Sequence, residues 1–432
     1  MSTATVRTAN SLSAFVVLGC LMAVGSVTQA EPMDTTQGWR FDLGKGPAAP
    51  GYVQVPASQR LDEEHDFGFD LDSKPRGLKR STSDLLRGDL VTSDQPFFFS
   101  MKLPEGNYQV TLTLGDPEEA TSTYVKAESR RLMLPKVETK PGDFVQATFT
   151  VNTRTPMILG DDHVRLKSRE HGVLHWDDKL TLEFSGKRPA VCAIEITPNT
   201  EAVTVFVLGD STVADQPQEP WNSWGQMLTR FLGPGVAVAN HAESGESIKS
   251  SLGARRVKKV LTSLKEGDYV LVQFGHNDMK DKDPDALAKY KANFQQLIDD
   301  VRAKGAHPVL ITSMARKAGV ERPTLKDYPD TVRAIAQEKD VPLIDLNMMS
   351  VTLYKALGDQ LDAAFQDGSH HNAFGSYLLA NCVAEGIREN VPELAKHLRA
   401  DATPFDPSKP MSPEAFDVPA SPSVDLTKPD GS

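Results

Sequence analysis

Cysteine is scarce in this sequence, with three residues in a chain of 432. Cys20 falls in an apolar stretch near the start, which leaves Cys192 and Cys382 for the rest of the chain. Two thiols are too few for a disulfide scaffold or for a cysteine-based metal site. Because they fall in different predicted domains, pairing and burial as free thiols both stay open.

Positive charge is in deficit, since 47 Lys and Arg residues face 58 Asp and Glu residues and the formal net charge is −11. Arg7 is the only charged side chain among the first thirty residues, so loss of that stretch would take the net charge from −11 to −12. A chain of this charge is repelled by nucleic acid. The sequence therefore predicts no nucleic-acid partner.

Long apolar runs are also missing. The stretch at residues 15–24 is too short to span a bilayer, and small residues lead from it to Ala30. This pattern is typical of a signal peptide cleaved after Ala30. Lipid attachment at Cys20 is disfavoured because the apolar run continues past it. We predict that residues 1–30 are a signal peptide and that the mature protein is secreted, to the periplasm or beyond, without stable membrane insertion.

Helical periodicity is absent between residues 39 and 196, where short alternating runs are separated by turn residues. Residues 97–103 and 108–114, joined by Pro104-Glu105-Gly106-Asn107, have the pattern of a β-hairpin. Several such strands predict an antiparallel β-sandwich, assigned to residues 31–198.

The pattern then changes to strands that alternate with amphipathic helices, over residues 199–402. This alternation predicts an α/β domain with a five-stranded parallel sheet, whose first strand is central. The predicted strands are residues 203–208, 236–239, 269–274, 308–312 and 342–346, and the clearest helices are residues 286–303, 325–338 and 375–389. Residues 403–432 are polar and rich in proline, and their composition predicts a disordered tail or linker.

Ser211 follows the first strand of this α/β domain, in the segment Gly209-Asp210-Ser211-Thr212. Open α/β sheets place ligands at the carboxyl ends of such strands. We expect a helix to begin directly after the strand, so Ser211 is either a nucleophile at the sheet edge or the cap of that helix. The segment alone leaves both interpretations open.

Other strand ends supply the remaining groups that acyl transfer needs. Asp367 and His370 lie three apart on one loop, where a carboxylate can orient an imidazole. We predict that Ser211 attacks, His370 takes its proton and Asp367 orients His370. The backbone N–H groups of Ser211 and Gly245, with the Asn277 amide, would form the oxyanion hole. Each group is equally a common turn or cap residue when taken alone.

Gly209-Asp210-Ser211, Gly245, Gly275-His276-Asn277-Asp278 and Asp367-Gly368-Ser369-His370 resemble the four blocks of the SGNH (GDSL-type) hydrolases, in family order. Residues 209–214, 224–226, 240–242, 267–269 and 370–375 are similar to the rhamnogalacturonan acetylesterase branch. The resemblance implies a flavodoxin-like sheet and a serine esterase that removes O-acetyl groups from plant cell-wall polysaccharide, without cofactor or metal. Glu246 departs from the branch, which usually carries an arginine there.

The N-terminal sandwich resembles the galactose-binding-like domains that accompany polysaccharide enzymes, which implies sugar binding or a purely structural role. Trp39, Trp176 and residues 97–99 fit either sugar stacking or a buried core. Acidic pectin should be repelled by the net charge unless Lys249, Lys280 or Arg316 lies near the cleft.

Three alternative functions stay open at this stage. An acetyl xylan esterase or other carbohydrate esterase would use the same catalytic groups on a neutral polymer. A lipase or thioesterase would want an apolar acyl channel, whereas the loop at residues 215–221 is polar. A non-catalytic glycan-binding protein is disfavoured because all the catalytic residue types are present.

Overall fold

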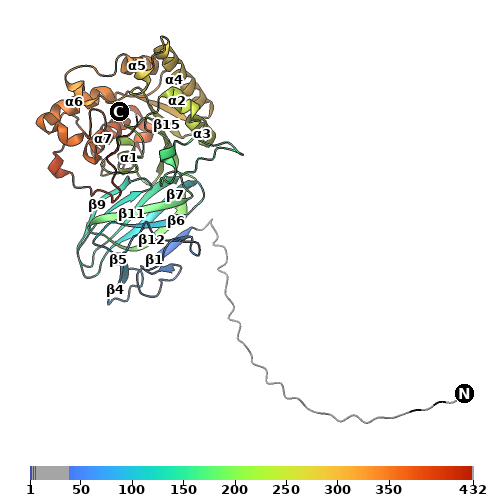
Figure 1. The fold of residues 1–432 in the computed structure, drawn as a ribbon. Helices are drawn as coiled ribbons and strands as arrows, with labels where there is room; N and C mark the ends of the chain where they lie inside the picture. Colours follow the sequence, from blue (N-terminus) through green and yellow to red (C-terminus); the bar gives the residue numbers. More distant parts are fainter. Residues whose placement is uncertain (2, 4, 6–37, 431–432) are drawn as a thin grey trace. The chain divides into compact units, whose positions relative to one another are not determined.

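The computed structural model describes residues 38–430, together with residues 1, 3 and 5. The predicted signal peptide therefore lies almost entirely outside the described residues. Residues 36–432 group as one unit, in which a β-sandwich is followed along the chain by an α/β layer structure (Figure 1). None of the helices described is both long enough and apolar enough to cross a membrane.

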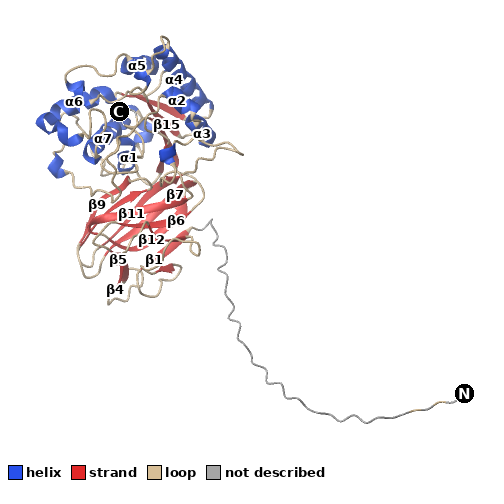
Figure 2. Cartoon of the chain, in the orientation of Figure 1, coloured by secondary structure: helices blue, strands red, loops and turns tan. Residues whose placement is uncertain are grey.

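The first part of this unit is built from two β-sheets, as Figure 2 shows in red. One sheet has seven strands, with the order β10-β7-β12-β1-β2 and with β5 linking β4 to β12. Its strands are β1 (Trp39–Leu43), β2 (Val53–Val55), β4 (Arg76–Lys79), β5 (Asp89–Thr92), β7 (Gly106–Gly115), β10 (Phe144–Thr153) and β12 (Ala190–Pro198). The other has five strands in the order β3-β6-β11-β8-β9. They are β3 (Phe67–Asp70), β6 (Phe97–Lys102), β8 (Thr121–Ala127), β9 (Arg131–Thr139) and β11 (Lys179–Arg188).

The predicted hairpin of residues 97–114 is wrong. Strand β6 pairs with β3 and β11, whereas β7 pairs with β10 and β12 in the other sheet. The turn at Pro104 and Glu105 therefore crosses from one sheet to the other. Both strands alternate apolar and polar residues, and this alternation is the same whether two strands pair or face each other across a core.

The aromatic residues considered for sugar stacking are buried instead. Trp39, Trp176 and Phe97 to Phe99 are all less than a tenth exposed. Phe97 stacks on Phe184, and the other core side chains fill the space between the two sheets. Trp39, Trp176, Phe97 and Phe99 are therefore packing residues, whereas Phe98 lines one wall of a cavity.

The second part of the unit contains a five-stranded parallel sheet with the order β14-β13-β15-β16-β17. Its strands are β13 (Val203–Gly209), β14 (Val236–Asn240), β15 (Tyr269–Gln273), β16 (His307–Ile311) and β17 (Leu343–Ile344). Each lies within two residues of its predicted position. The order is that of flavodoxin-like sheets, and the crevice beside β13 is where the strand order reverses. The sequence therefore predicted this parallel sheet correctly, but its first strand, β13, lies inside the sheet next to the edge strand β14, and β15 is the middle strand.

Helices cover both faces of the parallel sheet because successive strand residues point to opposite sides. Val205 and Val207 pack with α1, α6 and α7, whereas Phe206 and Leu208 pack with α2 to α5. The helices are α1 (Trp224–Leu228), α2 (Ile248–Gly253), α3 (Arg256–Ser263), α4 (Ala286–Ala303), α5 (Tyr328–Lys339), α6 (Leu346–Leu357), α7 (Ala373–Asn390) and α8 (Pro392–Ala395).

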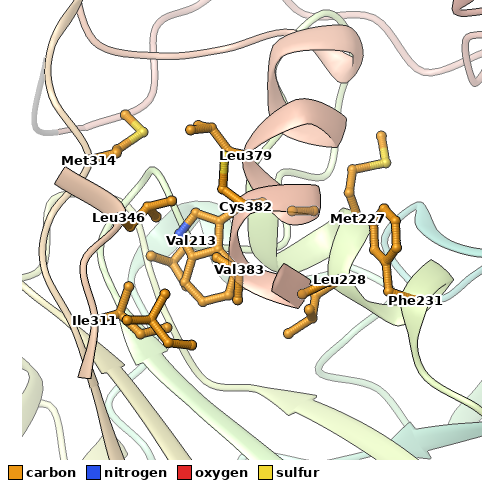
Figure 3. Packing of buried hydrophobic residues seen from close by; sticks show 14 of the residues in the cluster. Val213, Met227, Leu228, Phe231, Ile311, Met314, Leu346, Leu379, Cys382 and Val383 are labelled. Carbon is orange, nitrogen blue, oxygen red and sulfur yellow. The ribbon is translucent and has the colours of Figure 1, made fainter. Parts of the chain in front are cut away.

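Cys382 lies on α7 inside the first of these cores, next to Leu379 and Val383 (Figure 3). Cys192 is buried in the sandwich, and both cysteines are free thiols. Burial raises the pKa of both, because the interior disfavours the thiolate. The sequence left open whether the two cysteines pair, and in the structure they are not paired.

The C-terminal segment differs from its predicted disorder. Phe416 packs against Phe374 and Tyr377. Further along, Lys126 of the sandwich donates hydrogen bonds to Pro419 O and to Ser421 Oγ, at 2.7 and 2.8 Å. The composition argument counted only apolar content, whereas this segment is held largely by polar contacts to buried charged groups.

Candidate active site

The turn after β13 positions Ser211, and Asp210 rather than Ser211 caps it. The N–H groups of Val213 and Ala214 both donate to Asp210 O at 3.0 Å. The Thr212 N–H donates to Asp210 Oδ1 at 2.9 Å. The expected helix does not follow, because the next helix, α1, begins only at Trp224. The loop between them contains two prolines, which cannot continue a hydrogen-bonded turn.

Asp210 is itself held by the third sequence block. Its Oδ2 lies 3.1 Å from His276 Nδ1, and His276 Nε2 lies 3.1 Å from Met314 O. Burial alone would raise the pKa of Asp210, but His276 and the two Thr212 donors hold it below its usual range. Asp210 therefore stays ionised as a fixed acceptor behind the turn that carries Ser211.

Ser211, His370 and Asp367 form a hydrogen-bonded chain. Ser211 Oγ lies 2.8 Å from His370 Nε2, and His370 Nδ1 lies 2.9 Å from Asp367 Oδ2. The N–H groups of Ser369 and His370 donate to Asp367 Oδ1, each at 2.7 Å. Burial would raise the pKa of Asp367, but these donors and the His370 ring hold it well below its usual range. A carboxylate in this position fixes the tautomer in which Nε2 can accept the serine proton.

His371, the neighbour of His370, points into the core. Its Nε2 lies 3.0 Å from the Tyr354 hydroxyl, and its ring centroid is 4.0 Å from that of Phe365. Burial, with the nearby His370 and His276 rings, lowers the pKa of His371 to about 3. It is therefore a neutral packing residue.

The three predicted oxyanion donors come from separate strand ends. Gly245 has φ of 77°, a conformation that suits glycine. Neither the Ser211 N–H nor the Gly245 N–H donates to another main-chain group of residues 38–430. One amide hydrogen of Asn277 is used, because Nδ2 donates to Glu246 O at 3.0 Å. The second amide hydrogen stays available.

Glu246, the residue after Gly245, is buried and paired with cations from other segments. Its Oε1 lies 3.0 Å from Lys167 Nζ and 3.8 Å from Arg256 Nε. Lys167 also donates to Ser244 O at 2.6 Å. Lys167 belongs to the sandwich, so the loop that carries Gly245 is braced by the preceding domain.

A second set of sandwich residues holds the loop on the other side of Ser211. Arg131 Nε donates to Asp215 Oδ2 at 2.7 Å, and this pair is 1% and 0% exposed. Arg130 donates to Trp221 O at 2.9 Å. Gln216 Nε2, in the same loop, donates to Ser211 O at 2.7 Å. Sequence reasoning singled out the loop at residues 215–221 but missed Arg130 and Arg131, since nothing local to these arginines signals a partner so far along the chain.

Trp221 lies beside the predicted base. Its ring meets that of His370 edge to face, with centroids 5.9 Å apart, and its Nε1 donates to Asp425 O at 3.0 Å. The C-terminal segment thus passes close to His370. The Glu219 N–H also donates to Ser423 O at 2.8 Å.

A cavity of about 650 Å³ opens next to these loops. Four segments line it: the sandwich loops, the loop after Ser211, the loop after β14, and the C-terminal segment. Representative members are Arg130, Arg169, Gln216, Trp221, Ser244 and Pro429. The lining combines charged and polar side chains with apolar ones, and the wall surface exposed to the cavity is mainly apolar. Another cavity of about 640 Å³ lies around Gly233 to Gly235 and His397. The predicted site residues themselves line neither cavity, and only the first adjoins the loops that flank them.

Of the three cations expected near the cleft, Arg316 lies nearest the predicted base. It donates to Ser369 Oγ and, at 3.3 Å, to His276 O. Lys249 is exposed and pairs with Asp281 at 3.1 Å. Within the described ranges no cluster of three or more His, Cys, Asp or Glu side chains is arranged to hold a metal ion.

Comparison with known proteins gives matches to both parts of the chain. Residues 207–377 match the GDSL-like lipase/acylhydrolase family, and residues 39–143 match the galactose-binding-like domain of β-agarase/YXIM-type esterases. The chain is 37% identical over 218 residues to rhamnogalacturonan acetylesterase RhgT from Bacillus subtilis, across 45% of this chain and 94% of RhgT. It is 27% identical over 387 residues to the uncharacterized esterase YxiM of the same organism, across 85% of this chain and 94% of YxiM. The crystal structure of YxiM aligns with a TM-score of 0.43 and 25% identity, across 81% of this chain and 98% of that one.

Proposed function

We propose a mechanism and a substrate class from one premise: the chain belongs to the GDSL-like lipase/acylhydrolase (SGNH hydrolase) family and is a carboxylic ester hydrolase. The proposed activity is the removal of O-acetyl groups from plant cell-wall polysaccharide, with rhamnogalacturonan as the first candidate. The observation that carries the mechanism is the hydrogen-bonded chain Asp367–His370–Ser211.

In the proposed first step, Ser211 Oγ attacks the acetyl carbonyl carbon while its proton passes to His370 Nε2. The tetrahedral intermediate then collapses, and the sugar oxygen leaves with the proton from His370. In the second step His370 takes a proton from water, and the resulting hydroxide attacks the acetyl-serine. Acetate leaves and Ser211 regains its proton. Asp367 stays ionised throughout and stabilises the imidazolium.

The proposed oxyanion hole stabilises negative charge on the carbonyl oxygen in both steps. Its donors are the N–H groups of Ser211 and Gly245 and the Asn277 amide. The hydrogen bond from Asn277 to Glu246 O fixes the amide in advance, so little reorganisation is needed as charge develops. The hydrogen bond from Lys167 to Ser244 O likewise fixes the loop that carries Gly245 in advance.

The substrate proposal rests on two supports. RhgT, at 37% identity, is named a rhamnogalacturonan acetylesterase, and a cavity whose lining includes Arg130, Arg169 and Gln216 opens next to the loop after Ser211. The match of residues 39–143 to a galactose-binding-like domain is in keeping with a polysaccharide substrate. Secretion is part of the proposal, because a plant polymer lies outside the cell that degrades it and residues 1–30 have the pattern of an export signal.

Acetate release from acetylated rhamnogalacturonan, xylan and mannan tests the substrate, and the Ser211→Ala variant tests the mechanism. We expect the variant to keep its fold and to lose about three to six orders of magnitude in kcat on a small acetyl ester. Activity within about tenfold of wild type would exclude Ser211 as the nucleophile. Faster release from xylan than from rhamnogalacturonan would move the substrate to a neutral polymer.

A further inference from the structure

Two cations of the sandwich lie beside the Gly245 loop and stay partly exposed. Lys167 and Arg169, at the short 3₁₀ helix Ser168–Glu170, have side chains that are 31% and 38% exposed. A Cβ atom built on Gly245 would lie 3.6 Å from Lys167 Nζ. The ammonium group of Lys167 therefore lies close to the backbone of Gly245, which is a proposed oxyanion donor.

The guanidinium of Arg169 is anchored on two of its three nitrogens. Nε donates to Glu243 Oε1 at 2.9 Å, and Nη2 donates to Ser244 O at 2.6 Å. The third nitrogen, Nη1, contacts the carboxylate of Asp430 in the C-terminal segment. A guanidinium held in this way presents Nη1 in a fixed direction, which favours a carboxylate partner.

Asp430 places a carboxylate at this position. The Cβ of Asp430 would lie only 2.9 Å from a Cβ built on Gly245, so its side chain packs over the bare glycine. Its side chain is 63% exposed, and the neighbouring Pro429 lines the 650 Å³ cavity together with Arg169. An exposed ion pair of this kind exchanges readily, since its net free energy is small.

We propose that Arg169 Nη1 and Lys167 form a subsite for the carboxylate of a uronate residue in the substrate, and that Asp430 occupies this subsite in the free chain. The proposal rests on the proposed function, because the uronate must belong to the acetylated saccharide whose ester reaches Ser211. It also accounts for how a chain with a net charge of −11 accepts an acidic polymer. The net charge of the chain repels an acidic polymer, but Lys167 and Arg169 attract its carboxylate locally through a direct contact.

The carboxylates near Lys167 and Arg169 do not cancel the positive charge of this subsite completely. Burial, reinforced by the charge of Glu170, raises the pKa of Glu243 to about 7. Burial thus disfavours the charged form of the carboxyl group that is paired with Arg169. Glu246 and Glu170 are shared with Arg256.

The test compares kcat/KM for acetylated rhamnogalacturonan oligosaccharides with kcat/KM for the same oligosaccharides after their uronates are reduced to neutral sugars. We expect Arg169→Met to lower the ratio of acidic to neutral substrate about tenfold. Asp430→Asn should raise this ratio about threefold, since it removes the competing carboxylate. Asp417→Asn is the matched control, because Asp417 is a C-terminal acid paired with a half-exposed cation, Lys136 at 2.6 Å, outside the cavity lining.

A double variant separates recognition from loop support. In the Arg169→Met background, Asp430→Asn should leave the ratio unchanged, because the two substitutions disrupt one contact. An equal loss on both substrates in Arg169→Met would mean that Arg169 only supports the Ser244 loop, and would overturn the subsite. A ratio for Asp430→Asn equal to that for Asp417→Asn would overturn the role of Asp430. Absence of acetate release from every saccharide would refute the proposed function itself, and the subsite with it.

Discussion

Adjacent histidines at 370 and 371 offer a sharp test of the catalytic assignment, because the structure gives them opposite environments. His370 bridges Ser211 and Asp367, whereas His371 lies in the core against Tyr354 and Phe365. Replacement of His370 by alanine removes the proposed base. Replacement of His371 by alanine removes only packing and one hydrogen bond.

The structure sets the magnitude of both effects. His370→Ala should lose activity as severely as Ser211→Ala, since the two groups act as a unit. His371→Ala should retain activity within about tenfold but lower the free energy of unfolding by about 3 kcal/mol. That figure combines the loss of a buried ring with the loss of the Tyr354 partner. The lost ring also packs against Gly375, whose bare Cα lets it approach closely.

The pH dependence of stability gives a second readout for His371. Its pKa is about 3 in the folded chain, against about 6.5 in an unfolded one. Between these values the unfolded chain binds a proton that the folded chain rejects, so this group lowers the free energy of unfolding as pH falls. The full difference amounts to roughly 5 kcal/mol below pH 3. His371→Ala removes this dependence, so its stability deficit relative to wild type should shrink between pH 7 and pH 4.

The assays are kcat/KM on a small acetyl ester at a temperature where both variants are folded, and urea unfolding at several pH values. If the His371→Ala variant were folded but inactive while the His370→Ala variant stayed active, the catalytic base would be His371 and the assignment would be wrong by one residue. A stability deficit in His371→Ala that is constant with pH would refute the account of its burial.

Two further substitutions test the oxyanion hole and the contact between domains. Asn277→Ala should lower kcat about a hundredfold to a thousandfold with little change in KM, as measured on the small ester, and a change in KM alone would assign Asn277 to substrate binding. Arg131→Met should lower the free energy of unfolding by about 3 kcal/mol in urea, because Asp215 keeps only Asn240 at 2.8 Å and the more distant Arg154 at 3.6 Å. Unchanged stability would contradict a structural role for this buried pair.

Much of the α/β part was predictable because its signals are local. A β-branched run ending at Gly209 marks a buried parallel strand whatever surrounds it, and α4 was predicted at its observed bounds from periodicity alone. The three residues Ser211, Asp367 and His370 were named from strand ends, and the structure brings them within hydrogen-bond distance. Ser211 follows β13 at the edge where the parallel strands end, whereas Asp367 and His370 lie on a loop after α6 and the 3₁₀ helix Gly358–Ala364, so the tertiary structure decided that this loop meets Ser211.

The errors arose where local pattern is ambiguous. Strands β6 and β7 have the alternation of a hairpin, yet they lie in different sheets, because alternation fixes which face is apolar and not which strand is the partner. The helix expected after Ser211 was replaced by a single turn capped by Asp210. The C-terminal segment was judged on apolar content, whereas hydrogen bonds to Lys126 and Trp221 hold it.

The sequence by itself determined the two kinds of domain, the strand that carries Ser211, and the residue types available for acyl transfer, because each depends on short-range periodicity and spacing. Only the tertiary structure decided what surrounds them. Arg131 meets Asp215 from 84 positions away, and Arg169 meets Asp430 from 261 positions away. Such pairs leave no periodic trace, since their specificity lies in the geometry of two folded surfaces that meet. The sandwich's support for both loops beside Ser211 therefore became visible only in three dimensions.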